Sequence, residues 1–385
     1  MDKQHIGQNV RRLRLQKGWT QAKLHEEAGL SLPAIGSIET GKVEPRFSNI
    51  NKISEALNVD VYQLLKEPPR LDSVRFRANR KMKRRDHILA EVADWLNNYS
   101  LLESLLSEKQ HNCIKLITDK VDLQEESRKK AISAVSIART IFGLGDNEPI
   151  YDLCSLVESN GIKVFERPLN SSDFFGLSVG EEAGGPAVIV NTNERISVER
   201  WIFTVAHELG HLILHQTAYD SSVEVENDQE ELEANLFASH FLVPEKAFIK
   251  AWEGYYGMPL VDRVLRVKRI FNVSYKTILY RVNELMGKEQ NIWKRFYYRY
   301  KMQYGKSLTN HQEPLGVDKN HFRAVEPESK ISEEPSKLDR NEFGEGHFRS
   351  LVRRAVESES ISASKAAKML NLSISDFNQL ASCWV

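Results

Sequence analysis

The stretch that decides the fold of this chain reads Thr204-Val-Ala-His-Glu-Leu-Gly-His-Leu-Ile-Leu-His215. Its apolar residues recur at helical spacing, so we expect a buried helix over about 198–215. On that helix His207 and His211 lie four residues apart on one face, where both imidazoles can reach one Zn²⁺. Glu208 projects about 100° further around the helix. The pattern therefore predicts a zinc site in which Glu208 is the general base that takes a proton from a zinc-bound water.

A third zinc ligand is expected from the helix predicted over about 229–241, which ends before Pro244. Glu231 and Asn235 share a face of this helix because they are four residues apart. We predict Glu231 as the ligand and Asn235 as the group that orients a ligand histidine by a hydrogen bond. Glu230 and Glu233 are the alternative ligands.

Two further histidines offer other ligand sets. A site made of His207, His211 and His215 would need one metal to bridge two further turns of helix, about 12 Å along the axis between His207 and His215. A straight helix does not allow this, so we expect His215 to have a helix-end or pocket role. His240 is expected to be packed or to face solvent. The alternative for the whole motif is that its histidines are ordinary core or surface residues.

Composition limits the classes of protein to consider. The 385 residues suffice for two or three domains, and 53 basic side chains balance 53 acidic ones. Any affinity for nucleic acid must therefore come from a local basic surface. The three cysteines have no CxxC spacing, so neither a disulfide framework nor a thiolate zinc site is expected. Without a signal peptide or a long apolar stretch, we expect a cytoplasmic protein with no membrane contact.

The N-terminal residues, about 3–66, are typical of five short helices separated by tight turns. Thr20 and Ser31 are expected to cap the second and third helices, and Gly29 and Gly41 to end them. This stretch resembles the XRE (Cro/repressor-like) helix-turn-helix family. The residues that carry the resemblance are Thr20-Gln21, Ala28-Gly29-Leu30-Ser31, Ile35, Ile38-Glu39-Thr40-Gly41, Ile53, Leu57 and Val61. The resemblance implies that the third helix enters the major groove of double-stranded DNA.

The expected recognition helix, Ser31-Leu-Pro-Ala-Ile-Gly-Ser37, departs from the family because it lacks Arg, Asn and Gln. The candidate DNA contacts are Gln21, Ser31, Pro33, Ala34 and Ser37 near bases, with Arg11, Arg12, Lys42 and Arg46 near phosphates. The alternative is a domain used only for dimerisation or protein binding. A dense basic run at 75–85 predicts either a solvated linker or further non-specific phosphate contacts.

A second resemblance covers residues from about 120 to 290, which look like the ImmA/IrrE family of metallopeptidases. Its motifs here are Asn191, Arg200-Trp-Ile-Phe-Thr204, His207-Glu-Leu-Gly-His211, His215, Glu231 to Ala238, Pro244, Val273-Ser274 and Arg281. Strands are expected at 162–166, 174–179 and 187–190. The resemblance implies a zincin-like α+β domain that cleaves helix-turn-helix repressors. It identifies no oxyanion stabiliser among Tyr219, Tyr255 and Tyr256.

We therefore predict a multidomain, mainly α-helical chain. The expected parts are a helix-turn-helix domain at 1–67, a basic and helical connector at 68–120, a zincin-like α+β domain with a small sheet at 121–304, a flexible linker at 305–345 and a small helical module at 346–385. That last module is either a second helix-turn-helix or a plain helical appendage. The predicted function is a homodimeric DNA-binding regulator with an intrinsic zinc endopeptidase acting on a repressor or a neighbouring regulator. The alternative is a repressor or antitoxin whose zincin-like domain binds a partner or senses a signal without proteolysis.

Overall fold

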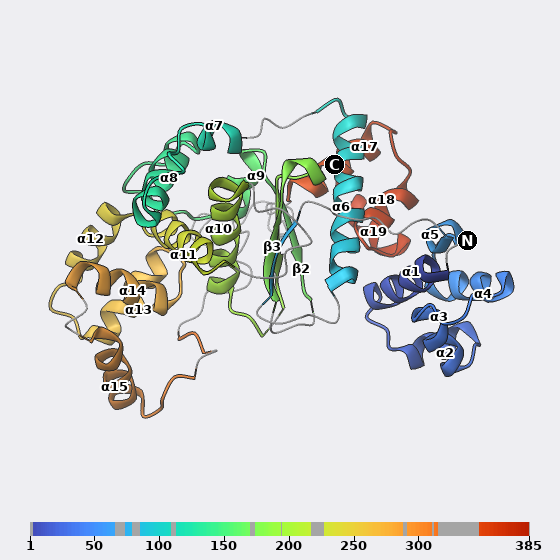
Figure 1. Cartoon of the computed structure of the whole chain (residues 1–385), viewed down its shortest axis with the longest axis horizontal. Helices are drawn as coiled ribbons and strands as arrows, with labels where there is room; N and C mark the ends of the chain where they lie inside the picture. The colour runs from blue at the N-terminus through green and yellow to red at the C-terminus, as the bar shows by residue number, and fades with distance from the viewer. Residues whose placement is uncertain are drawn as a thin grey trace. The chain divides into compact units, whose positions relative to one another are not determined.

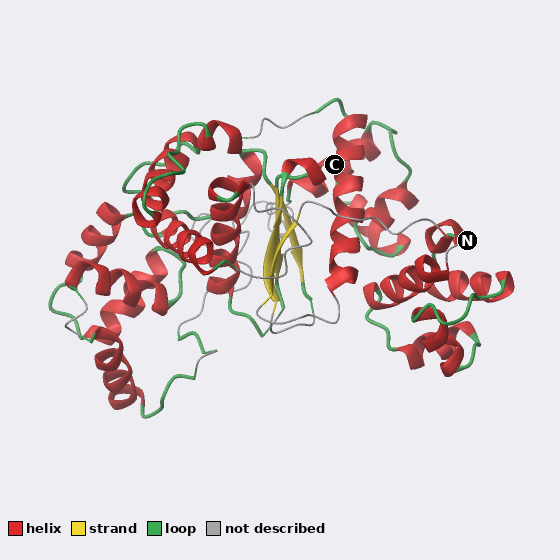
Figure 2. Ribbon diagram, viewed as in Figure 1, coloured by secondary structure: helices red, strands yellow, loops and turns green. Residues whose placement is uncertain are grey.

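The computed structural model confirms a mainly helical chain with one small sheet (Figure 2). It describes residues 3–65, 74–78, 85–108, 113–169, 174–193, 195–216, 227–287, 291–309, 312–314 and 346–384. The chain divides into two compact units, the first made of 1–71 with 82–98 and the second of 72–81 with 99–385. The long helix α6 (Arg85–Leu105) contributes to both.

The first unit contains the expected short helices. They are α1 (Lys3–Gln16), α2 (Gln21–Ala28), α3 (Leu32–Glu39), α4 (Phe47–Leu57) and α5 (Val61–Leu65). Side chains at the predicted caps fix the helix starts, because Thr20 accepts a hydrogen bond from the Lys23 amide and Ser31 from the Ala34 amide. Gly29 ends α2 in the left-handed region at φ 61°.

Close packing and one buried ion pair hold these helices together. A Cβ on Gly7 of α1 would lie 2.2 Å from the Ile38 carbonyl oxygen, so only glycine lets α1 approach α3 this closely. Beside that crossing, Arg14 donates to both carboxylate oxygens of Glu39, at 2.5 and 2.9 Å. Gln21 donates to the same carboxylate at 2.8 Å. The buried charges of α1 and α3 are therefore paired, as burial requires.

The second unit is built on a sheet with the strand order β1-β3-β4-β2. The strands are β1 (Val74–Ala78), β2 (Lys163–Arg167), β3 (Phe174–Val179) and β4 (Ala187–Asn191), with a 3₁₀ turn η1 (Glu181–Ala183) between the last two. The β2–β4 pair is parallel, and the β1–β3 and β3–β4 pairs are antiparallel. The strands expected from the sequence are β2, β3 and β4.

Strand β1 differs from the expectation, because it comes from the stretch predicted as a basic connector. Its backbone pairs Val74 with Val179 and Phe76 with Leu177. Pairing at a sheet edge satisfies backbone groups whatever the side chains are, so the basic run gave no signal of it. The remainder of that run, up to residue 84, lies outside the described residues.

Helix α10 (Val198–Leu214) lies between the sheet and α11 (Asp228–Leu242), which in turn packs on α8 (Ser127–Ile141) (Figure 1). Helices α7 (Ile114–Thr118) and α9 (Leu153–Ser159) extend the same core. Apolar side chains of α10 and α11, among them Val205, Leu209 and Phe237, are fully buried between these layers. This burial fixes the helix that carries the histidine pair.

Four helices continue the second unit: α12 (Glu245–Gly254), α13 (Leu260–Ile270), α14 (Tyr275–Met286) and α15 (Ile292–Tyr304). A buried ionic group ties the segment after them to α10. Lys268 of α13, which is fully buried, donates to Glu199 at 2.8 Å and to Glu313 at 2.7 Å. Burial raises the pKa of Glu313 despite this ion pair. Glu313 is thus packed, although the sequence predicted a flexible linker from 305. Residues 315–345 lie outside the described residues.

The C-terminal helices are α17 (His347–Glu357), α18 (Ala363–Met369) and α19 (Ile374–Ala381). Helix α17 packs against the end of α6, where the Phe348 and Tyr99 rings lie 5.5 Å apart. Arg354 pairs bidentately with Glu108, with both contacts at 2.6 Å. Across the part of the chain that the structure describes, no helix is both long and apolar enough to span a bilayer.

A second buried ionic group lies where α8, α11 and α14 meet. Glu284 of α14 contacts Arg281 on its own helix, Arg128 of α8 at 2.7 Å and His240 of α11 at 3.4 Å. Burial raises the pKa of Glu284, but hydrogen bonds from His240 and Arg128 and the charge of Arg281 lower it by more, to about 2. His240 is therefore a packed residue, in line with one of the two expectations for it.

We predict that Glu284→Gln destabilises the metal-free protein by about 2 kcal/mol at neutral pH, allowing for the solvent screening of a partly exposed group. Because the folded-state pKa is depressed, this contribution is complete above the unfolded-state pKa of about 4.3 and is lost as the pH falls through about 2. The difference between wild type and variant should therefore shrink as urea unfolding is measured from pH 7 towards pH 3.

The exposed Glu253 of α12 provides a matched control, since Glu253→Gln removes the same charge from the surface. It should change the free energy of unfolding by less than about 0.5 kcal/mol at every pH. An equal effect of the two substitutions would contradict the assignment.

Candidate metal centre

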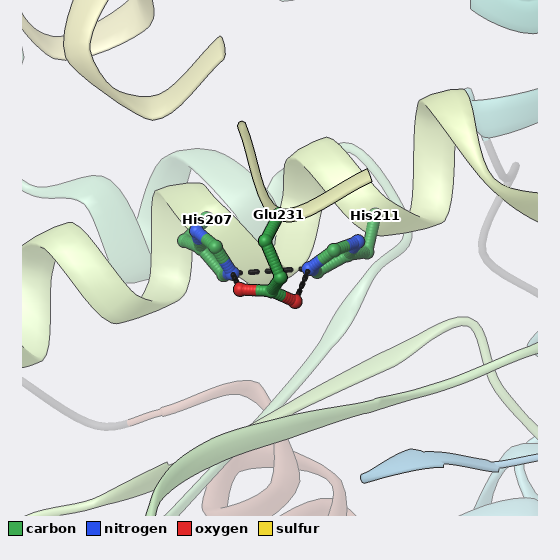
Figure 3. Close-up of side chains that lie close together, drawn as sticks. All are labelled: His207, His211 and Glu231. Carbon is green, nitrogen blue, oxygen red and sulfur yellow. Dashed lines mark hydrogen bonds and ion pairs between the residues drawn. The ribbon is translucent and has the colours of Figure 1, made fainter. Parts of the chain in front are cut away.

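Three side chains from two helices converge on one point (Figure 3). The Nε2 atoms of His207 and His211 lie 3.0 Å apart. The carboxylate oxygens of Glu231 lie 3.4 Å from the first and 3.1 Å from the second. His207 and His211 are fully buried, and Glu231 is half-buried.

These separations fit a single small cation. Zinc bonds of 2.0–2.1 Å in a tetrahedron place neighbouring donor atoms about 3.3 Å apart. The three observed donor separations, 3.0 to 3.4 Å, lie around this value. Two imidazoles and one carboxylate are also the donor set of catalytic zinc sites, which leave the fourth position open.

The local sequence explains why α10 presents both histidines. Ser197 caps the helix by accepting from the Arg200 amide, and the apolar side of the helix is buried against β3 and β4. Gly210 lets α11 approach, since a Cβ there would lie 3.1 Å from the Phe237 ring. This close crossing of α10 and α11 carries Glu231 to the histidine pair.

Each histidine of the pair is oriented by a second hydrogen bond. His207 Nδ1 lies 3.1 Å from Asn235 Oδ1, in the arrangement predicted from the sequence. His211 Nδ1 lies 2.9 Å from His215 Nδ1. Partners of this kind fix the ring position and the tautomer of a metal-binding histidine.

His215 in turn is held by a buried carboxylate. Its Nε2 lies 2.9 Å from Glu233 Oε2, and Lys130 of α8 contacts the same oxygen at 2.6 Å. Burial raises the pKa of Glu233, but hydrogen bonds from Lys130, Ser127 and His215 outweigh it and the net pKa lies below the usual range. Glu233 therefore supports His215. It does not join the converging group, which was the alternative role expected for it from the sequence. The sequence gave no signal for Lys130.

Glu208 is fully buried and lies outside the group of converging donors. Ser178 of β3 donates to Glu208 Oε2 at 2.9 Å. Gly176 on the same strand keeps this approach open, because a Cβ there would lie 2.5 Å from Thr204. Neither β3 residue was singled out from the sequence, since their contact with α10 exists only in the folded chain. Tyr219 and Tyr256 are two of the tyrosines considered from the sequence as oxyanion stabilisers. Tyr219 lies outside the described residues, and Tyr256 is 87% exposed.

The candidate DNA contacts in the first unit fall into two groups. Ser31, which caps α3, and Pro33 on α3 are exposed, and Ala34 and Ser37 are half-buried. Arg11, Lys42 and Arg46 are exposed. Arg12 differs, because it is only 4% exposed and is ion-paired with Asp94. Arg12 thus stabilises the unit and is not available to a phosphate. Gln21 is half-buried and donates to Glu39.

We predict that Asn235→Ala and His215→Ala each weaken metal affinity about 10- to 100-fold, because a freed imidazole loses its fixed orientation. His207→Ala and Glu231→Ala should weaken it by at least about tenfold, since each removes a proposed ligand. Competition against a chromophoric chelator measures all four variants on the folded protein.

Glu230→Gln is the matched control on α11, because Glu230 is next to Glu231 in sequence but contacts Asn227 at 3.3 Å. Its metal affinity should equal that of wild type. Loss of metal from this variant, with retention in Glu231→Ala, would make Glu230 the ligand instead.

Two segments of the chain are similar to known protein families. Residues 157–283 match the M78 peptidase family model, described as the IrrE N-terminal-like domain. Residues 10–64 match a helix-turn-helix family model. A hypothetical transcription factor of Neisseria meningitidis serogroup B (strain ATCC BAA-335 / MC58) is 36% identical over 63 residues, which are 16% of this chain and 59% of that protein. The match thus spans less than two thirds of that relative.

Two solved structures align with low scores. PlcR from Bacillus thuringiensis, solved in complex with the peptide PapR7 and DNA, is 11% identical with a TM-score of 0.18, over 78% of this chain and 95% of its own. ComR from Streptococcus suis is 14% identical with a TM-score of 0.16, over 99% and 96%. Scores this low carry no conclusion about the fold. The chain thus joins a segment similar to the helix-turn-helix family to a segment similar to the IrrE N-terminal-like domain of the M78 peptidase family.

Proposed function

We propose that this protein is a DNA-binding transcriptional regulator that carries its own zinc-dependent endopeptidase. The observation behind the proposal is the pairing of a three-donor cluster with a buried carboxylate outside it. His207, His211 and Glu231 would hold the metal, and Glu208 on the same helix would serve as general base. The match to the M78 peptidase family supports a metallopeptidase-type domain.

Three donors converge among the residues that the structure describes, and this number favours a catalytic centre over a structural one. Structural zinc sites are closed by four protein ligands, and catalytic sites use three. A buried carboxylate such as Glu208 costs free energy unless it is paired, and it adds nothing to a purely structural site. Its retention beside the cluster is what a hydrolytic site requires.

When bound, zinc would supply Lewis-acid chemistry and lower the pKa of a bound water. The side chains of the protein would transfer the proton and orient the metal ligands. Glu208 would accept a proton on its carboxylate and later return it to the leaving amine. Ser178 Oγ, which donates to Glu208 Oε2, would hold that carboxylate in place. The Asn235 and His215 contacts would keep both ligand imidazoles in one orientation.

The proposed substrate is a protein with a helix-turn-helix fold, either a repressor or a neighbouring regulator. This choice rests on the resemblance to the ImmA/IrrE family, whose members relieve repression by such cleavage. The first unit would bring the peptidase to DNA as a homodimer, because helix-turn-helix proteins bind two half-sites as dimers. Exposed Arg11, Lys42 and Arg46 would contact phosphates, and exposed α3 residues would face the bases.

We predict that Glu208→Gln lowers cleavage of the substrate by at least about 10²-fold, because glutamine keeps the shape of the side chain but cannot accept a proton. Metal content, folding and DNA binding should stay at wild-type level. The measurement is cleavage of candidate regulators encoded beside this gene, with and without chelator, together with metal analysis.

Glu230→Gln again serves as the control, as it removes a carboxylate from α11 without touching the cluster. It should cleave as wild type does. If Glu208→Gln also relieved repression normally in cells, proteolysis would not be the mechanism. The partner-binding alternative would then replace the proposal.

We also predict that Arg11→Glu/Lys42→Glu/Arg46→Glu weakens binding to all duplex sequences alike. Each lost phosphate contact should reduce the slope of log affinity against log salt by about 0.9. This slope is measured by fluorescence anisotropy with a labelled duplex. The salt concentration is varied between roughly 50 and 200 mM, where phosphate contacts change the affinity strongly. Reversal of exposed Lys294 and Lys301 on α15 is the control. A wild-type protein without salt-sensitive binding would make the first unit a protein-interaction module.

A further inference from the structure

The C-terminal helices α18 and α19 repeat the turn of the N-terminal helix-turn-helix in the same register. In each, a capping residue precedes both helices, Thr20 and Ser31 in the first, Ser362 and Ser373 in the second. The two caps are eleven positions apart in both cases. All four side chains accept a hydrogen bond from the amide three residues later.

The turn between the helices has the same backbone form in both places. Nine positions after the first cap stands a left-handed residue, Gly29 at φ 61° and Asn371 at φ 55°. Asparagine is the residue that replaces glycine most readily in this region. Left-handed geometry at this point sets the angle at which the second helix leaves the turn, and turns of three to four residues are typical of helix-turn-helix motifs.

Burial follows the same pattern along both motifs. The fourth position after the first cap is buried in each, as Leu24 and Ala366, and so is the fourth after the second cap, as Ile35 and Phe377. A preceding helix packs on the motif in both cases, α1 on α3 and α17 on α18. The C-terminal helices are thus built as a helix-turn-helix and not as an irregular appendage.

The second helix of the C-terminal motif presents side chains that α3 lacks. Asn378 and Gln379 of α19 are both exposed. Amide side chains can donate and accept towards the edge of an adenine in the major groove. Asp376 is engaged locally, because Ser373 Oγ donates to its carboxylate at 2.7 Å and its amide is held by the cap.

Charge on the first helix of the motif fits a phosphate backbone. Lys365 and Lys368 are exposed on α18, and among the residues that the structure describes neither has an ion-pair partner within 4 Å. The equivalent lysine of the N-terminal motif, Lys23, is instead paired with Glu27 at 2.7 Å. Helix α17 packs on the remainder of its unit through Phe348, which contacts Tyr99, and Arg354, which contacts Glu108.

We propose that α17, α18 and α19 form a second DNA-binding helix-turn-helix, with α19 as the recognition helix in the major groove of duplex DNA. Lys365 and Lys368 contact the phosphates that flank the groove, and Asn378 and Gln379 contact base edges. This site adds base-reading side chains that the N-terminal recognition helix does not have. It stands apart from the peptidase proposal and from the N-terminal DNA contacts.

The test uses the full-length chain with the N-terminal contacts disabled by Arg11→Glu/Lys42→Glu/Arg46→Glu. This protein should still bind a mixed-sequence duplex in a salt-dependent way. Adding Lys365→Glu/Lys368→Glu should weaken the remaining binding at least about tenfold and lower the salt slope by about two. Adding Lys294→Glu/Lys301→Glu on α15 should change neither, and thermal unfolding should show that all variants are folded.

A selection from a randomised duplex library tests base reading in the wild-type background. Asn378→Ala/Gln379→Ala should lose preference at one or two positions by about fivefold or more, with the salt slope unchanged. The proposal is overturned if the variant with both lysines replaced and the variant with both amides replaced each bind DNA as their parent proteins do. It is also overturned if these substitutions alter only the oligomeric state, which would make α19 a protein interface. A third outcome is that the N-terminal variant loses all DNA binding and the α18 and α19 substitutions have no effect in the wild-type background. That outcome overturns this proposal and leaves the proposed function intact.

Discussion

The candidate metal centre depends on the close crossing of α10 and α11 at Gly210. Glu231 and the histidine pair are on different helices, so their separation is set by how near the two axes come. At Gly210 a Cβ would already crowd the Phe237 ring. A wider crossing would move Glu231 away from the histidine pair, whose donor atoms now lie 3.0 to 3.4 Å from one another and from the carboxylate. Packing of the apolar core thus sets the geometry of the polar site.

The sequence predicted those parts of the site that depend on helical periodicity. His207 with His211, and Glu231 with Asn235, are each four residues apart, and a helix places such pairs on one face whatever surrounds it. The parts that were missed come from other elements. Ser178 lies on a strand and Lys130 on α8, and only tertiary packing brings them to Glu208 and Glu233. Periodicity within one helix contains no information about such contacts.

The same distinction explains the outcome for the fold. Helix caps, left-handed turn residues and short apolar strands are local features, so the helices of the first unit and the strands β2 to β4 were predictable. Strand β1 and the packed Glu313 were not, because the first depends on a free sheet edge and the second on the buried Lys268. Both stretches have the polar composition of a linker. Composition describes the side chains themselves and does not show which residues they contact in the folded chain.

Burial also separates the basic residues of the first unit into two kinds, those that are buried and ion-paired and those that are exposed. On α1, Arg14 pairs with Glu39 and Arg12 with Asp94, so these two arginines hold the helices of the first unit together. Arg11, next to Arg12 in sequence, is exposed. A buried cation that loses its partner costs far more than a surface charge that is removed. Changes at Arg12 and Arg14 therefore act on stability, and changes at Arg11 act on whatever approaches the surface. A basic run in the sequence indicates a nucleic-acid surface only after its buried members have been set aside.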